Sequence, residues 1–184
     1  MEWERVQMHA SVREGYQVLL RADAELFVPL ACEKIAAYYR ALAEKSLAWI
    51  CEVYGEDLRK QFLAVEDVRE RARFGTRRYS FSMQCVWENG AHAAFLCEGI
   101  LSGENEAAER TRRRSAAVWN LENEQLLPRG QVEKMLLAKG EKKRPPFACD
   151  GMYPCNEALI YFKNPTREGE GAEWQIPLSR EVLL

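Results

Sequence analysis

The fold is decided by residues 76–126, which read TRRYSFSMQCVWENGAHAAFLCEGILSGENEAAERTRRRSAAVWNLENEQL. From Tyr79 to Trp87 apolar and polar residues alternate, which is typical of a strand with one buried face. Asn89-Gly90 follows, a strong hairpin signal because a type I′ turn needs positive φ at both central residues. We therefore expect Tyr79–Trp87 to pair antiparallel with Ala91–Ile100 and His92 to lie opposite Trp87. This register buries Phe81, Met83 and Cys85.

The rest of the chain supplies an α+β pattern around this hairpin. We expect an N-terminal hairpin with a turn at residues 13–15, a helix from about residue 30 to Phe62, a third strand over Arg110–Asn120, a short helix from Pro128 to about Ala138, and strands over Ala158–Phe162 and 174–178. The predicted fold is a mostly antiparallel sheet with one long and one short helix packed on one face. At 184 residues the chain fits a single domain, residues 1–184.

The long helix carries two adjacent apolar stripes, and so wide an apolar surface indicates packing against a sheet. One stripe comprises Ile35, Tyr39, Leu42, Trp49 and Val53, and the other comprises Leu47, Ile50, Tyr54, Leu58 and Phe62. Gly55 interrupts the pattern, and we expect it to bend or end the helix.

The charge and the N-terminus limit the function classes. A formal net charge of -2 gives no global attraction to nucleic acid, so no nucleic-acid partner is expected. Residues 1–5 carry acids where a secretory signal would be basic, and no apolar run is long enough to cross a bilayer. The chain as written is expected to be cytoplasmic; a signal or anchor preceding Met1 would make it extracellular or membrane-anchored instead.

Six cysteines allow a disulfide framework only in a secreted protein. Cys32, Cys51, Cys85 and Cys97 fall in helical or strand patterns, where a free thiol acts as a small buried hydrophobe. We expect these four to be reduced and structural. Cys149 and Cys155 lie in a predicted loop, and whether they form a bridge stays open.

Two groups of candidate binding residues stand out, Trp87 with His92 and a basic run. His92 has an ordinary pKa suited to proton transfer, but it lacks a partner close in sequence; the alternative is a ring stacked on Trp87. Arg110, Arg112 and Arg114 belong to the basic run, which could contact phosphates or an acidic partner. The alternative is a charged strand that protects a sheet edge.

No catalytic or metal-binding motif is present. The sequence lacks calcium-loop, zinc-helix and phosphate-loop spacings, so no metal and no cofactor is expected, and no catalytic residue is assigned. Carboxylates that pair only in the folded chain, as glycoside hydrolysis requires, stay open as an alternative.

The order of elements resembles a known family. The residues that carry the likeness are Ala36-Ala37-Tyr38-Tyr39-Arg40 in the long helix, Ser115–Leu121 at the end of the third strand, and Trp174–Leu178 in the closing strand. Over about residues 26–180 the chain is similar to the RsiV-like C-terminal domain family. This domain of unknown function occurs in a lysozyme-sensing anti-sigma factor and beside polysaccharide deacetylase domains.

The chain departs from this family at two places. Gly90-Ala91-His92 matches part of the family's Gly-Gly-Ala-His turn but lies 27 positions before Trp119, whereas Leu101–Asn105 has the family's spacing without the Ala-His pair. The Tyr-rich loop before the last strand is shortened to residues 164–171. A ligand of the family therefore cannot be transferred to this chain residue by residue.

These observations predict a non-catalytic binding or sensing module that recognises a protein partner. The resemblance to a sensing domain and the missing catalytic motifs favour it. The alternative is an enzyme that acts on a cell-wall or sugar substrate through spatially paired carboxylates. Whether the chain is an enzyme stays open, with binding favoured.

Overall fold

The fold was analysed in a computed structural model that describes residues 1–102, 111–137, 145–155, 157–166 and 169–178. The chain divides into two compact units: the first unit comprises residues 1–82 and 99–112, and the second unit comprises residues 83–98 and 113–184. The strand order is β1-β2-β3-β4-β5-β6 in one sheet and β7-β8-β9 in a smaller sheet. The α+β class is confirmed, with a mostly antiparallel arrangement.

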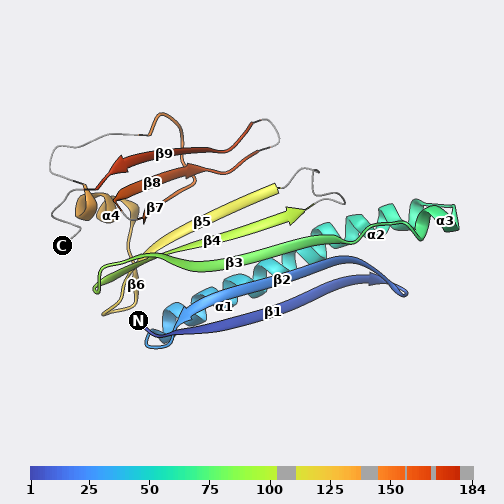
Figure 1. The fold of residues 1–184 in the computed structure, drawn as a ribbon, viewed down its shortest axis with the longest axis horizontal. Helices are drawn as coiled ribbons and strands as arrows, with labels where there is room; N and C mark the ends of the chain where they lie inside the picture. Colours follow the sequence, from blue (N-terminus) through green and yellow to red (C-terminus); the bar gives the residue numbers. More distant parts are fainter. Residues whose placement is uncertain (103–110, 138–144, 156, 167–168, 179–184) are drawn as a thin grey trace. The chain divides into compact units, whose positions relative to one another are not determined.

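The elements follow one another along the chain as labelled in Figure 1. They are β1 (Trp3–Glu14), β2 (Gln17–Pro29), α1 (Glu33–Trp49), the π-helix η1 (Ile50–Tyr54), α2 (Gly55–Ala64), α3 (Val68–Arg71), β3 (Arg77–Glu88), β4 (His92–Ser102), β5 (Thr111–Asn120), β6 (Gln125–Leu126), α4 (Arg129–Leu136), β7 (Gly151–Cys155), β8 (Ala158–Lys163) and β9 (Ala172–Pro177). The predicted N-terminal hairpin, long helix and third strand are all present. Arg110 and Ala138 lie outside the described residues.

The hairpin of β1 and β2 is antiparallel, with Met8 opposite Ala24 and Ala10 opposite Ala22. The pairing shifts between Val12 and Arg13, where β2 contributes one additional residue, Leu19. A bulge of this kind bends the strand and changes which side chains face inward. Leu19 and its neighbour Leu20 are accordingly both fully buried.

The helices α1 and α2 lie along this hairpin (Figure 1). Leu47, Ile50, Leu58 and Phe62 of the second predicted stripe are buried, and so are Ile35 and Tyr39 at the start of the first. The first stripe is wrong at Trp49 and Val53, whose side chains are 55% and 52% exposed. A helix presents only one side to a neighbouring sheet, and that side runs from Ile35 and Tyr39 of the first stripe into the second stripe.

Gly55 neither ends nor breaks the helical segment, which continues from η1 into α2 as far as Ala64. A Cβ atom built on Gly55 would lie 2.5 Å from Cγ2 of Val12 in β1. Glycine is therefore required here because the helix backbone approaches the strand closely.

The turn between β3 and β4 lies one residue later than predicted. The N–H of Asn89 donates to the carbonyl of His92 over 3.1 Å, so these two residues face each other. Gly90 has φ 81°, whereas the described non-glycine residues include only Glu124 with positive φ. The central residues of the turn are thus Gly90 and Ala91, and only Gly90 has positive φ, so the prediction of a type I′ turn is wrong. The prediction that His92 lies opposite Trp87 is also wrong, because His92 faces Asn89.

The Asn89 side chain explains this shift, because its Oδ1 accepts the N–H of His92 over 2.9 Å in place of a turn carbonyl. Of the three residues predicted to be buried in this strand, Phe81 and Met83 are buried, at 7% and 1% exposure, whereas Cys85 is only half-buried. In β4 every residue from Ala93 to Cys97 is buried, so both faces of this strand are covered.

The second unit has its own apolar core. It is built from β4, β5, α4 and the three-stranded sheet and includes Leu96, Val118, Leu136, Tyr161 and Ile176. β7 was expected to be a loop, but Met152 pairs with Tyr161 and Pro154 with Leu159. Its residues Met152, Tyr153 and Pro154 are all buried, so the strand shows no alternation that a sequence pattern could reveal.

Candidate functional site

The predicted binding residues Trp87 and His92 have different surroundings in the structure. Trp87 is half-buried and packs against the core of the second unit. His92 opens β4, and its main chain closes the turn with Asn89. Its Nδ1 atom is buried and has no hydrogen-bond partner among the described residues. The predicted roles of these two residues in binding remain predictions.

The basic run separates into side chains with different surroundings. Arg110 lies outside the described residues, and Arg112 and Arg113 are exposed on β5. The side chain of Arg114 is only 8% exposed. The guanidinium of Arg114 is therefore largely withdrawn from solvent and is poorly placed to meet a partner.

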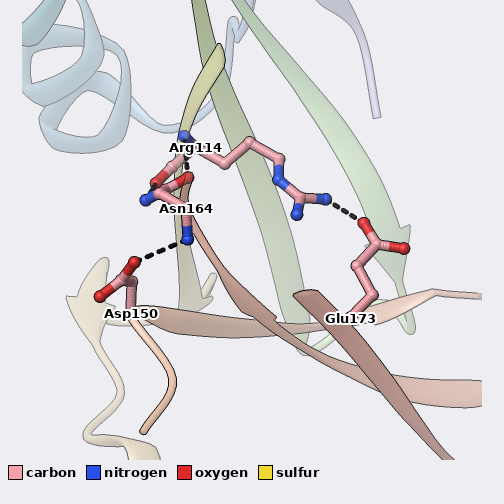
Figure 2. Close-up of polar contacts among 4 residues, drawn as sticks. All are labelled: Arg114, Asp150, Asn164 and Glu173. Carbon is pink, nitrogen blue, oxygen red and sulfur yellow. Dashed lines mark hydrogen bonds and ion pairs between the residues drawn. The ribbon is translucent and has the colours of Figure 1, made fainter. Parts of the chain in front are cut away.

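Arg114 is at the centre of a polar cluster in the second unit, drawn in Figure 2. Its backbone N–H donates to Oδ1 of Asn164 over 2.7 Å, and Nδ2 of Asn164 donates to its carbonyl over 2.9 Å. The backbone N–H of Asn164 donates to Oδ2 of Asp150 over 2.7 Å. The side-chain amide of Asn164 thus pairs with both main-chain groups of Arg114, and the carboxylate of Asp150 in turn accepts the backbone N–H of Asn164.

The side chain of Arg114 extends across the small sheet. Its Cζ atom lies 4.8 Å from the ring centroid of Phe162 in β8, and its Nη1 donates to Glu173 in β9. Stacking on an aromatic face and pairing with a carboxylate both offset the loss of hydration of a buried guanidinium. This cluster links β5 to β8 and β9, and its geometry serves packing more than ligand binding.

A second polar cluster combines α4 with the small sheet. Nε of Arg129 donates to Oε1 of Glu133 over 2.9 Å, and the hydroxyl of Tyr161 donates to the same oxygen over 3.0 Å. Nη1 of Arg129 lies 2.8 Å from Sγ of Cys149, and its Cζ lies 5.1 Å from the Tyr161 ring centroid. A cation, a carboxylate, a phenol and a thiol therefore meet at one place.

Burial and neighbouring groups shift the pKa values of Tyr161 and Arg129 in this cluster. Burial raises the pKa of Tyr161, and its hydrogen bond to Glu133 raises it further. Burial alone would lower the pKa of Arg129, but Glu133 and Cys149 outweigh burial and raise it. Tyr161 therefore stays protonated and Arg129 stays charged at neutral pH, which suits a fixed hydrogen-bond network.

One signal for this second cluster is visible in the sequence. Arg129 and Glu133 are four residues apart, the spacing at which helical side chains meet. Cys149 and Tyr161 lie 20 and 32 positions beyond Arg129, so only the tertiary structure brings them to it. Across the described ranges, no three His, Cys, Asp or Glu side chains gather in a way that would hold a metal ion.

All six cysteines are unbridged. Burial raises the pKa of Cys97 to about 12, although a hydrogen bond with Ser115 lowers it in part. Asp150 continues β7 by donating its N–H to Phe162, and an extended strand rises about 3.3 Å per residue. The Cα atoms of Cys149 and Cys155 are consequently at least about 12 Å apart, beyond the separation of about 7 Å that a disulfide can span.

Within the described part of the chain, no helix is both long enough and apolar enough to cross a membrane.

Comparison with known proteins yields a likeness of fold. No family model matches the sequence, and no curated protein matches it. The chain is similar to the crystal structure of a DUF3298 family protein from Pseudomonas aeruginosa PAO1, with a TM-score of 0.54 and 11% identity over 98% of this chain and 94% of the other. It is also similar to a DUF3298 family member from Bacteroides fragilis NCTC 9343, with a TM-score of 0.52 and 12% identity over 96% and 90% of the two chains.

At these identities the likeness establishes a shared fold and does not extend to a shared function. The expectation that the chain resembles a family of unknown function agrees with these neighbours. The narrower likeness to RsiV-like domains has no counterpart among them and remains a prediction. The chain thus has the fold of DUF3298 proteins over nearly its whole length.

Proposed function

We propose that this protein is a non-catalytic binding module that recognises a protein partner. The observation that carries the proposal is an apolar strip on the outer side of the long helical segment. Tyr38, Trp49 and Val53 are 45%, 55% and 52% exposed, and Leu42 is half-buried between them. Residues 38, 42, 49 and 53 recur at helical spacing and therefore share one side.

The chemistry of this strip suits a protein partner. Tryptophan and tyrosine are the side chains most enriched among residues that dominate binding energy, because each buries a large area with few rotatable bonds. An exposed Trp with an aliphatic neighbour one turn away fits an apolar groove on a partner. The strip also extends into η1, and π-helical turns are frequent at functional sites.

The polar groups of the second unit support the same view. Glu173 pairs with Arg114, Asp150 accepts from Asn164, and Glu133 accepts from both Arg129 and Tyr161. Each of these carboxylates is engaged by a protein group, and a general acid or base would first have to release that group. For one of these three carboxylates to act on a sugar, it would have to exchange its present partner for the substrate.

The test is affinity capture from the source organism followed by measurement with the purified partner. Trp49→Ala should weaken a 1:1 complex at least about tenfold, which corresponds to about 1.4 kcal/mol. Leu126→Ala removes an apolar side chain of similar exposure from β6 and should leave the affinity unchanged. Equal affinity of wild type and Trp49→Ala would overturn the assignment of this surface.

Two further variants separate the competing explanations. Arg112→Glu reverses an exposed charge on β5 and should weaken the complex only if the basic strand is the contact. Turnover of a peptidoglycan or acetylated-sugar substrate that Glu133→Gln abolishes would overturn the binding module in favour of an enzyme.

A further inference from the structure

The outer edge of β1 is an open strand edge. β1 is terminal in the strand order, and among the described residues its backbone pairs with β2 (Figure 1). The strand is 12 residues long and contains no proline. A long edge of this kind exposes a row of donors and acceptors to which another strand can bind.

Hydrogen-bonded and non-hydrogen-bonded pairs alternate along the hairpin, and this alternation shows which backbone groups of β1 face the open edge. The N–H of Leu30 donates to the carbonyl of Glu2, so the even-numbered residues of β1 direct their main-chain groups toward β2. Pro29, which has no N–H, lies opposite Trp3 at a non-hydrogen-bonded pair, which agrees with this assignment. The residues whose N–H and C=O groups point toward the open edge are therefore Arg5, Gln7, His9 and Ser11.

The side chains along the edge are incompletely covered. Val6, Met8 and Ala10 share the face on which the helices pack, yet each is only half-buried. Glu4 pairs with Arg40 of α1 at one end of this row, and Glu14 lies 3.8 Å from Arg59 of α2 at the other. Three apolar side chains thus lie between two ion pairs, and a further strand would complete their burial.

We propose that β1 pairs antiparallel with β1 of a second copy of this chain, about a two-fold axis at Met8. Met8 then lies opposite Met8 of the second copy, Val6 lies opposite Ala10, and Gln7 lies opposite His9. In an isologous pair of this kind every contact occurs twice, and each copy uses the same edge. The assembly therefore stops at the dimer and does not grow into a polymer.

The bulge after Val12 limits the length of the new ladder. A ladder centred on Met8 pairs residues 4–12 with those of the second copy, whereas one centred on His9 is confined to residues 6–12. Because each added pair contributes hydrogen bonds and side-chain contacts, the longer ladder is the more stable of the two.

Side-chain pairing disfavours the register on the other side of Met8. With the axis at Gln7, Val6 would lie opposite Met8 but Ala10 would lie opposite Glu4, so two apolar pairs would form among these residues. With the axis at Met8, Val6, Met8 and Ala10 of the two copies lie opposite one another and form three apolar pairs.

The geometry allows a direct chemical test. Because the odd-numbered residues carry the hydrogen bonds of the new ladder, Met8 and its copy form a non-hydrogen-bonded pair with Cα atoms about 4.5 Å apart. That separation is within the range of a disulfide. Met8→Cys should consequently form a disulfide between the two substituted positions under mild oxidation, identified by peptide mapping against the six native cysteines.

The matched control is Ala10→Cys, on the same face of the same strand. In this register, position 10 of one chain lies four residues, about 13 Å, along the strand from position 10 of the other chain. Two Ala10→Cys chains should therefore not form a disulfide with each other. A mixture of Ala10→Cys and Val6→Cys chains should bridge, because those positions are opposite. Bridging of Ala10→Cys alone, to the same extent as Met8→Cys, would overturn the register.

Mass measurement over a concentration series tests the dimer independently. As the concentration rises, the measured mass of the wild type should approach twice the chain mass of 21.2 kDa. Gln7→Pro removes an N–H that faces the open edge and none that pairs with β2, so it should abolish the dimer while far-UV circular dichroism stays unchanged. A wild type that stays at 21.2 kDa throughout, together with no Met8→Cys bridge, would refute the proposal.

Discussion

The side-chain amide of Asn164 pairs with both main-chain groups of Arg114: Oδ1 accepts the Arg114 N–H over 2.7 Å, and Nδ2 donates to the Arg114 carbonyl over 2.9 Å. The two residues are 50 positions apart in the chain. An asparagine in this position acts as a substitute for one residue of a neighbouring strand, because it offers one donor and one acceptor in a plane. It thereby satisfies two main-chain groups of β5 from the end of β8, which belongs to the other sheet.

Replacing Asn164 should lower the stability of the second unit. Asn164→Ala leaves one donor and one acceptor of Arg114 unpaired, and we expect a loss of about 2 kcal/mol in the free energy of unfolding. Asn164→Asp keeps the acceptor but sets a carboxylate oxygen against the Arg114 carbonyl, so it should be destabilising as well. Urea denaturation measures both. A change below about 0.5 kcal/mol in Asn164→Ala would show that water replaces the amide without cost.

Neighbouring arginines should respond differently to truncation. Arg114→Ala removes the stacking on Phe162 and leaves Glu173 without its partner, so we expect a loss of about 1 to 3 kcal/mol. Arg113→Ala, at the exposed adjacent position, should change stability by less than about 0.5 kcal/mol. Equal effects in denaturation experiments would contradict the burial of Arg114. Charge reversal at Arg114 is accordingly unsuited to a binding test.

Two glycines should respond with opposite signs to the same substitution. Gly55→Ala places a methyl group 2.5 Å from Val12, so it should destabilise the first unit by about 1 to 3 kcal/mol despite the better helix propensity of alanine. Gly130→Ala in α4 meets no atom within 4 Å and should stabilise the protein by up to about 1 kcal/mol. Thermal denaturation measures both, and Val12→Ala should partly rescue Gly55→Ala.

The buried thiol of Cys97 should make stability fall in alkali. Its folded pKa is raised from 9.0 to about 12, so its contribution is complete below about pH 9 and is lost as pH rises toward 12. Between about pH 8 and pH 10 we expect this one group to reduce the free energy of unfolding by about 1.4 kcal/mol. Cys97→Ala should remove this part of the pH dependence. Cys149→Ala, at a half-exposed position, serves as the control.

The sequence by itself determined the elements whose signal is local. Alternation with period two predicted the N-terminal hairpin and the burial of Phe81 and Met83, because neighbouring residues of a strand point to opposite faces. The long helix and the third strand were likewise predictable from residues adjacent in the chain. β7 was missed because its three central residues are all buried and show no period.

Only the tertiary structure decided which side chains meet. The side chain of Asn89 moved the central turn by one residue, and the hairpin packed against a side of the helix that includes residues of both predicted stripes and leaves Trp49 exposed. Arg113 and Arg114 are adjacent and alike in sequence, yet Arg113 is exposed whereas Arg114 contacts Asn164, Phe162 and Glu173 about 50 to 60 positions away. Local pattern determines which residues are strand or helix, whereas contacts between distant segments depend on how those elements pack, and composition does not encode that packing.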